Sequence, residues 1–232
     1  MHVVRRRRHL RPGRIAALAL AAASVTTVAA APAQAAAKKP TSTVATSGEV
    51  TATVKFTRST KAYNKYRDLR LTVEGPQGIL SKVKLPRIKD SFSRPAITLA
   101  DVNGDGVVDA IVDTFSGGAH CCSSSSVALS VATGWTKPIT RAWGNYGYQL
   151  KELGGAPGLE FSSFDDRFAY AFSSYAASFP AIQIMRIVDG AFADATRAYP
   201  DAIRADLAEK QTLYSGIVGD AGEEDYSNDV GQ

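Results

Sequence analysis

The stretch from Asp101 to Asp109, DVNGDGVVD, has the residue types and the spacing of a cation-binding loop. Calcium prefers about six to eight oxygen ligands, which a short loop can supply when carboxylates, amide oxygens and carbonyls stand at alternate positions. Five groups have that spacing here: the side chains of Asp101, Asn103, Asp105 and Asp109 and the backbone carbonyl of Val107. The pattern predicts that these five residues bind Ca²⁺.

The flanks of this loop indicate a β-hairpin. An EF-hand requires a bidentate Glu at its twelfth position, where this chain has Val112, and helices on both sides. Here the flanking segments PAITLA and VVDAIVDTF are rich in β-branched and apolar residues, which favour strands. We therefore expect a calcium loop between two strands, outside the EF-hand class.

The loop runs on into a second motif, SGGAHCC, which contains the only two cysteines of the chain. Adjacent Cα atoms lie about 3.8 Å apart, below the usual disulfide range of about 4.4–6.8 Å, so a bridge between Cys121 and Cys122 closes a strained ring. An oxidising compartment nevertheless favours oxidation, and we expect a vicinal disulfide. Three alternatives stay open: an intermolecular bridge, two reduced thiols, and a soft-metal site that includes His120.

Four residues beside the calcium loop are candidates for a further role: Asp113, Gly117, Gly118 and His120. Asp113 shares a strand face with Asp109, because alternate residues of a strand point the same way. It either supports the calcium ligands, or contacts the following turn, or is a satisfied polar group of the core, and we favour the last. Gly117 and Gly118 predict a tight turn that brings His120 and the cysteines back over the sheet. No helix-forming run follows them, which disfavours a phosphate-binding loop.

Alternation of apolar and polar residues predicts that the body of the chain is mainly β. In VTATVKFTRS, residues 50–59, apolar residues recur at every second position, and LRLTVE, ILSKVKL, VALSVATG and AIQIMRIV are similar runs. The exception is the segment of about residues 200–214, where Pro200 suits a first helical turn and Ile203, Leu207 and Tyr214 fall near one stripe. We expect a short C-terminal helix there.

An internal repeat divides the β region. ADVNGDGVVDAIV aligns with KELGGAPGLEFSS without a gap, and TGWTKPITRAW aligns with DGAFADATRAY. The two units, about residues 96–143 and 146–199, have the size of a four-stranded propeller blade of about 50 residues. A closed propeller needs about four to eight blades. We therefore expect two blade-like antiparallel four-stranded repeats plus N-terminal strands, and not a full closed propeller.

The second copy of the loop lacks most of the calcium ligands. Glu152 and Glu160 align with Asp101 and Asp109, but Gly and Ala stand at the third and fifth positions. We expect this copy to keep the hairpin without binding a metal ion.

Seven aromatic residues lie between Phe161 and Phe179. Phe168, Tyr170 and Phe172 would share one face of a strand, which is the ordinary way to build a β core. A stacking platform for sugars is the alternative, and we favour the core.

Residues 1–35 have the order of a secretory signal peptide: a basic run, a short Ala-rich apolar stretch and small residues before a cleavage site near Ala35. The arginine pairs also permit twin-arginine export in place of the general pathway. The leader carries six arginines, so its removal changes the formal charge from +5 to −1, and the basic composition is no evidence for nucleic-acid binding. We expect a flexible linker over 36–48, a single β-rich domain over 49–216 and an acidic tail over 217–232.

The loop pattern D-x-[DN]-x-D-G-x-x-D is similar to the calcium loop of FG-GAP, VCBS and integrin-type blades. Together with SGGAHCC, WGN-x-GY, DDRFAYAFSSYA and DG-x-F-x-D-x-T, it resembles a set of exported bacterial proteins, often actinobacterial. The resemblance covers Leu99 to Tyr199, about half of the chain. It implies a propeller-like β repeat and an exported location, and it implies no activity.

These features predict a secreted, extracellular β-module that calcium stabilises and that acts by binding an extracellular protein or a cell-wall glycan, without catalysis. We expect no nucleic-acid partner and no membrane span in the mature chain, and an oligomer is compatible with the sequence. Two alternatives stay open: a secreted hydrolytic or thiol-redox enzyme that uses His120, Cys121 and Cys122, and a structural envelope protein that assembles through exposed sheet edges. A vicinal disulfide would remove the thiolate nucleophile that the enzyme needs.

Overall fold

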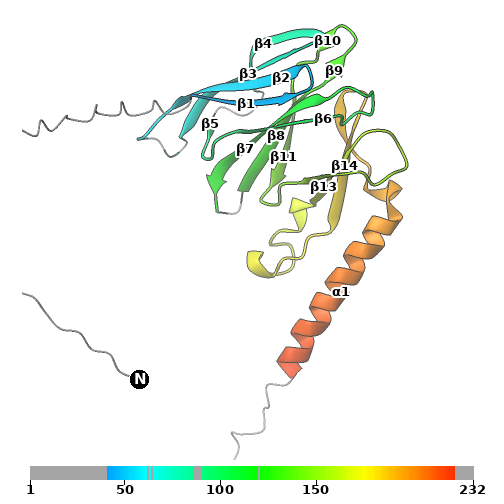
Figure 1. Cartoon of the computed structure of the whole chain (residues 1–232). Coiled ribbons are helices and arrows are strands. Elements are labelled where there is room, and N and C mark those ends of the chain that lie inside the picture. The colour runs from blue at the N-terminus through cyan, green and yellow to red at the C-terminus, as the bar shows by residue number, and fades with distance from the viewer. Residues whose placement is uncertain (1–40, 62, 64, 86–89, 120, 223–232) are drawn as a thin grey trace, which may run out of the picture. The chain divides into compact units, whose positions relative to one another are not determined.

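The structure is a computed structural model and describes residues 41–61, 63, 65–85, 90–119 and 121–222 (Figure 1). All of them belong to one unit, residues 39–232. The predicted signal peptide, His120 and the last ten residues of the predicted acidic tail lie outside the described residues.

The first sheet is antiparallel and comes from the N-terminal part of this unit. Its strands, in spatial order, are β1 (Ser42–Ser47), β2 (Val50–Arg58), β3 (Tyr66–Gly75) and β4 (Gly78–Lys84), and β5 (Asp90–Ser91) also pairs with β3. The prediction of a flexible linker over 36–48 was wrong for β1, which pairs with β2 from Ser42 opposite Lys55 to Ser47 opposite Val50. The physical reason is a tight two-residue turn at Gly48, whose positive φ of 55° suits a hairpin.

The two repeats form two further four-stranded antiparallel sheets. The second sheet has the order β11-β8-β7-β6, with β6 (Ala96–Ala100), β7 (Asp109–Gly118), β8 (Cys121–Ala128) and β11 (Ile139–Gly144). The third has the order β12-β13-β14-β15, with β12 (Gln149–Lys151), β13 (Glu160–Phe164), β14 (Ile182–Val188) and β15 (Ala191–Asp194). A short hairpin of β9 (Ser130–Val131) and β10 (Gly134–Trp135) extends the first repeat. The mainly β class with two four-stranded repeats is confirmed, and the described residues form no closed propeller.

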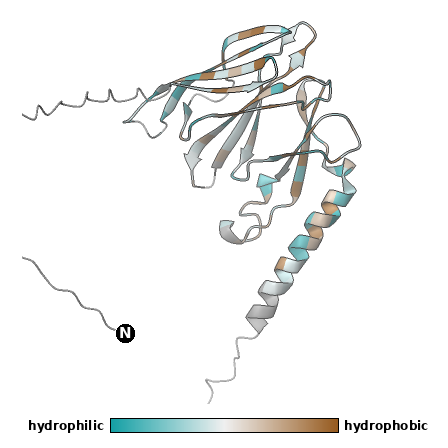
Figure 2. Ribbon diagram, in the orientation of Figure 1, coloured by the Kyte–Doolittle hydropathy of each residue, from teal (hydrophilic) through white to brown (hydrophobic). Residues whose placement is uncertain are grey.

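Two hydrophobic cores lie on opposite faces of the second sheet. Ala110 and Val112 of β7 belong to the core shared with the first sheet, whereas Ile111 belongs to the core shared with the third sheet. Alternation along a strand produces this division, because neighbouring side chains point to opposite faces. The apolar residues that alternate along the strands are visible in brown in Figure 2. The second sheet therefore lies between the two cores.

The aromatic segment after β13 is not a strand, so its prediction as β core was wrong. It forms two short 3₁₀ turns, η1 (Asp166–Phe168) and η2 (Tyr175–Ala177), joined by turns. Asp165 caps η1 by accepting the N–H of Arg167, and Tyr170 has a positive φ of 62°, which interrupts extended backbone. Phe172 is 87% exposed.

The C-terminal helix α1 (Pro200–Gly222) follows a third 3₁₀ turn, η3 (Thr196–Ala198), and is longer than the predicted 200–214. Residues 217–222, predicted as tail, are part of it. A hydrogen bond of Asp206 attaches the helix to β14: its Oδ2 accepts the N–H of Ile182 at 3.1 Å. The apolar residues Leu207 and Tyr214 are exposed and do not form a buried stripe. Across the described residues, no helix is both long enough and apolar enough to cross a membrane.

Candidate functional site

The loop between β6 and β7 is closed by hydrogen bonds within itself. Asp101 accepts the N–H of Gly104 at 2.6 Å on one carboxylate oxygen and that of Gly106 at 2.8 Å on the other. Asp105 accepts the N–H of Val107 at 2.9 Å, and the side-chain oxygen of Asn103 accepts the N–H of Asp105 at 3.0 Å. The backbone N–H groups thus turn inward and hold the side-chain oxygens in fixed positions.

Asp109 differs from the other acidic side chains of the loop in its burial. It is fully buried, and its two oxygens accept the backbone N–H of Val102 at 2.9 Å and of Ser130 at 2.8 Å. Burial raises the pKa of Asp109 to about 6, and the nearby negative charges of Asp105 and Asp101 act in the same direction. Asp109 therefore supports the loop from the interior.

The second repeat has the same support, although Gly154 and Ala156 replace Asn103 and Asp105. Glu160 is fully buried and accepts the N–H of Leu153 at 2.9 Å, seven residues before it, as Asp109 accepts that of Val102. Its other oxygen accepts the hydroxyl of Tyr199 at 2.6 Å. The acid at the ninth position is thus a structural feature of both loops.

The five predicted calcium ligands therefore divide into two groups. Asp101, Asn103, Asp105 and the carbonyl of Val107 lie on the accessible part of the loop, and their oxygens are the hard ligands that calcium prefers. Asp109 is enclosed and already bonded to two N–H groups. Among the described residues there is no group of three or more His, Cys, Asp or Glu placed to hold a metal ion. Calcium binding stays a prediction.

The two loops touch each other at glycines. A Cβ on Gly104 would come within 2.4 Å of the Cβ of Pro157 and 2.6 Å of the backbone nitrogen of Gly158, and Gly104 has a positive φ of 79°. Only glycine allows this close approach. The conformation of the first loop is therefore coupled to the contact between the two repeats.

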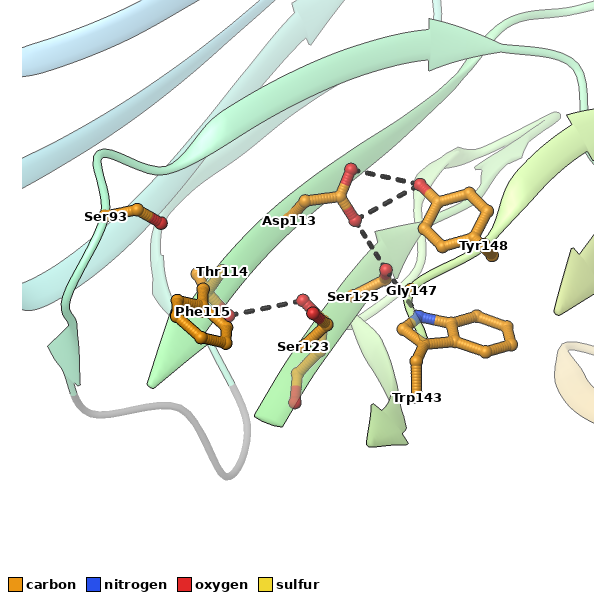
Figure 3. Close-up of a pocket in the computed structure, with 10 residues that line it drawn as sticks. Ser93, Asp113, Thr114, Phe115, Ser123, Ser125, Trp143, Gly147 and Tyr148 are labelled. Carbon is orange, nitrogen blue, oxygen red and sulfur yellow. Dashed lines mark hydrogen bonds between the residues drawn. The ribbon is translucent and has the colours of Figure 1, made fainter. Parts of the chain in front are cut away.

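A cavity of about 250 Å³ opens at the other end of β7, beside Asp113. Figure 3 shows the residues around it. They are mostly hydroxyl-bearing and aromatic: Ser93, Asp113, Thr114, Phe115, Ser123, Ser124, Ser125, Trp143, Gly147 and Tyr148. Asp113 is the only charged side chain in this set, so the cavity is negative.

The hydrogen bonds around Asp113 have fixed directions (Figure 3). The indole N–H of Trp143 can only donate, and it donates to the hydroxyl of Ser125 at 2.8 Å. Ser125 then donates its own proton to Asp113 at 2.5 Å. Tyr148 donates to both carboxylate oxygens, at 3.1 and 3.0 Å. Asp113 accordingly acts as an acceptor toward every described partner.

The electrostatic state of Asp113 follows from its surroundings. Burial raises its pKa, and the hydrogen bonds from Ser125 and Tyr148 oppose that rise. The pKa of Tyr148 is also raised, by burial and by the charge of Asp113, which keeps the phenol protonated as a donor. No ion pair to Asp113 occurs in the part of the chain that the structure describes.

Strand pairing and the second core position these groups. Asp113 stands directly opposite Ser125 in the β7–β8 pair. Trp143 on β11 packs against Tyr148 and Phe161, with ring centroids 5.0 and 5.7 Å apart. The donors are consequently held in place before any ligand enters. Ser125 is fully buried, so its hydroxyl orients Asp113 and is not reachable as a nucleophile.

Gly117 and Gly118, where a tight turn is predicted, are the last two residues of β7. Gly118 pairs with Cys121 where β7 meets β8. Gly117 has a φ of 88°, a Cβ there would lie 2.7 Å from the ring of Phe92, and the hydroxyl of Tyr63 donates to the Gly117 carbonyl. His120 lies outside the described residues, as does the side chain of Cys121. The disulfide and the enzyme that would use His120 stay predictions.

Sequence reasoning identified Asp113 and missed its partners. Asp113 is a satisfied polar group, as expected, and it also lines a cavity. Ser125, Trp143 and Tyr148 lie 12 to 35 residues away from the residues they bond, so no local spacing indicates them. The only available signals were the run SSSS on a strand and the motif WGNYGY, to which no role was assigned.

Comparisons with known proteins give two partial matches. A segment of 87 residues, 35% of this chain, is 32% identical to 14% of the length of "Uncharacterized protein y4bJ" from Sinorhizobium fredii. A segment of 101 residues, 42% of this chain, is 30% identical to 30% of the length of "Probable thylakoid lumen protein sll0997" from Synechocystis sp.. The chain thus spans less than a third of either relative. No family model and no solved structure matches the chain.

Proposed function

We propose that this protein is an exported β-module that calcium stabilises and that acts by binding, with the cavity at Asp113 as its binding site. The observation that carries the proposal is the half-buried carboxylate of Asp113, which lines an accessible cavity while Ser125 and Tyr148 hold it in one orientation. A satisfied core acid needs no cavity, whereas a ligand site needs a few fixed polar groups in a concave surface.

Calcium would act as a clamp on the first loop. Asp101, Asn103, Asp105 and the Val107 carbonyl would hold it, and Asp109 would support the loop from the interior. Because the loop touches the second repeat at Gly104, ordering it would stabilise the junction of the repeats. The resemblance to FG-GAP blades supports this assignment.

Export is supported by the order of the N-terminal residues and by the name of the Synechocystis relative, which places that protein in a lumen. In an oxidising compartment, a vicinal disulfide of Cys121 and Cys122 would stiffen the turn beyond the cavity. Intact mass before and after reduction would differ by about two hydrogens if this bridge exists. A dimer that dissociates on reduction would mean an intermolecular bridge instead.

Thermal unfolding of the purified protein tests the calcium clamp. Outside cells an affinity of about 10⁻⁴ M suffices, and calcium at 100 times that value would raise the free energy of unfolding by about 2.7 kcal/mol. We expect this rise in the native chain and its loss in Asp105→Ala. Equal melting temperatures with calcium and with chelator would remove the calcium site from the proposal.

The binding function is tested by NMR with n-butylamine, glucose and acetate as probes. The indole N–H of Trp143 bonds directly to the Asp113 network and reports on the cavity, and that of Trp135 is an internal control. We expect at least one probe to shift the Trp143 signal in a saturable way. If none does, the cavity is not a binding site for small polar groups.

A further inference from the structure

We propose that the cavity at Asp113 binds a primary ammonium group on a short aliphatic chain, an inference that rests on the binding function proposed above. The ligand chemistry follows from three properties of the cavity: its charge, its unused hydrogen-bond acceptors and its apolar wall.

The charge of the cavity is negative and uncompensated. Asp113 is the only Asp, Glu, His, Lys or Arg among the described residues that line it, and no described Lys or Arg pairs with it. A charge removed from water is stabilised when an opposite charge is brought into contact with it. The cavity therefore favours a cation and disfavours an anion.

The acceptors of the cavity suit N–H donors. An ionised carboxylate offers about four lone-pair positions, and Asp113 uses three of them for Ser125 and Tyr148. The hydroxyl groups of Ser125 and Tyr148 both donate to Asp113, so the carboxylate is held in a fixed orientation and its remaining position can only accept a hydrogen bond. Ser93 and Ser123, which also carry hydroxyl groups, line the same cavity. A primary ammonium has three N–H donors to distribute over such oxygens.

The wall of the cavity suits a short aliphatic stem. Phe115, Trp143 and Tyr148 contribute aromatic surface beside the carboxylate, and aromatic rings are favourable neighbours of cations and of methylene groups. The volume of about 250 Å³ is enough for a head group with a short stem and too small for a large ligand.

Other cations fit less well. A hard metal ion requires about six oxygen ligands with more than one carboxylate, and Asp113 is the single carboxylate of the cavity. A quaternary ammonium has no N–H group and would leave the remaining acceptor position of Asp113 without a donor. The geometry thus selects for a primary amine in its protonated form. That group occurs on free small amines and on lysine side chains.

Titration of the full chain at pH 7, followed by calorimetry and by the Trp143 indole signal, tests the inference. The probes are n-butylamine, its neutral analogue N-butylacetamide, tetramethylammonium, and Nα-acetyl-lysine methylamide. We expect n-butylamine to bind about tenfold or more tightly than the neutral and quaternary probes. If the lysine derivative binds more tightly than n-butylamine, the ammonium group comes from a peptide side chain. If n-butylamine binds more tightly, the ammonium group comes from a free amine. Both outcomes support the proposal.

Two variants separate recognition from folding. Asp113→Asn keeps the shape and removes the charge, and we expect it to lose affinity for n-butylamine about tenfold or more while it stays folded by circular dichroism. Asp189→Asn removes a charge from an exposed turn between β14 and β15 and should bind as the native chain does. The inference is overturned if Asp113→Asn binds as tightly as the native chain, or if the neutral probe equals the amine.

The failure of this inference is distinguishable from failure of the proposed function. If glucose or acetate shifts the Trp143 signal and n-butylamine does not, the cavity binds ligands of another class and only the ammonium assignment is wrong. If calcium stabilises the chain while no probe binds, both the ammonium assignment and the binding site are wrong and the calcium clamp stands.

Discussion

Replacing Glu160 by Gln should destabilise the protein although the second loop lacks counterparts of Asn103 and Asp105. Glu160 is fully buried, accepts the N–H of Leu153 and the hydroxyl of Tyr199, and lies 3.5 Å from the guanidinium of Arg186. A carboxamide keeps one acceptor oxygen and presents an NH₂ group to the remaining donors. It also removes the counter-charge of Arg186, whose side chain is only 17% exposed.

The magnitude follows from these contacts. Breaking a buried ion pair by removing one partner costs about 3–5 kcal/mol, and the partial access of Arg186 to water moves the expected cost to about 3 kcal/mol, the lower end. In a domain of this size each kcal/mol lowers the melting temperature by about 2–4 °C, so a decrease of about 6–12 °C is expected.

Urea unfolding in the presence of chelator is the appropriate assay, because no bound cation then contributes. Glu152→Gln is the matched control: it makes the same chemical change in the same loop, at an exposed position, and should change stability by less than about 0.5 kcal/mol. The midpoint for Glu160→Gln should fall with little change in the m-value. Equal midpoints for the two variants would refute the view that the ninth-position acid supports the loop.

Three further perturbations follow from the described contacts. Gly104→Ala should cost more than Gly106→Ala, since both positions have φ near 80° but only a Cβ at Gly104 meets the second loop; equal denaturation midpoints would contradict that contact. Phe161→Ala should cost about 3–5 kcal/mol in thermal unfolding because its ring is fully buried, whereas Phe172→Ala, at 87% exposure, should cost less than about 0.5 kcal/mol. Because the pKa of Asp113 is raised in the native state, the native protein holds the proton of this carboxyl group to higher pH than the unfolded chain does. The stability that this protonation contributes is therefore full below pH 3.8 and is lost as the pH rises through the native pKa. Measured against pH, Asp113→Asn should therefore gain stability relative to the native chain as pH rises, and a constant difference would show that Asp113 is not desolvated.

The repeat made most of the fold predictable from the sequence. Two segments that align without a gap must build similar hairpins, and the second and third sheets are four-stranded as expected. β1 was missed because STVATS is composed of small and hydroxyl-bearing residues, which resemble a linker until pairing with β2 is known. Its stability comes from a partner strand and not from its own apolar content.

The aromatic segment shows the opposite error. Phe168, Tyr170 and Phe172 alternate as a strand would, but alternation over five residues also occurs in a turn, and the cap by Asp165 ends the strand earlier. In helix α1 the apolar residues at 203, 207 and 214 fall near one stripe, yet all three are exposed and a hydrogen bond of Asp206 attaches the helix to β14. In both cases tertiary contacts, which are absent from a local pattern, determine burial.

The candidate cavity could be predicted only in part for a similar reason. Asp113 was singled out because its position on the strand was readable from the period of two. Its donors Ser125 and Tyr148 come from β8 and from the segment before β12, and Trp143 on β11 donates to Ser125, so their convergence depends on the order β11-β8-β7. The sequence contains that order only implicitly, because β9 and β10 intervene between β8 and β11.

Asp109 and Glu160 make the same structural contact in the two loops, whereas the other ligand residues of the calcium pattern differ between them. Both acids are buried and both accept a backbone N–H seven residues earlier, so this interaction shapes the loop whether or not other acids are present. Of the other two acids of the first loop, Asp101 aligns with Glu152, whereas Asp105 aligns with Ala156, so the second copy forms its hairpin without an acid at the fifth position. Asp105, which has no acidic counterpart in the second loop and stands at an alternate position to Asp101 and Asn103, is the acid whose presence a cation would explain. Calcium binding, as proposed, is therefore a property of the first loop alone, because the second repeat forms the same hairpin without the full set of ligands.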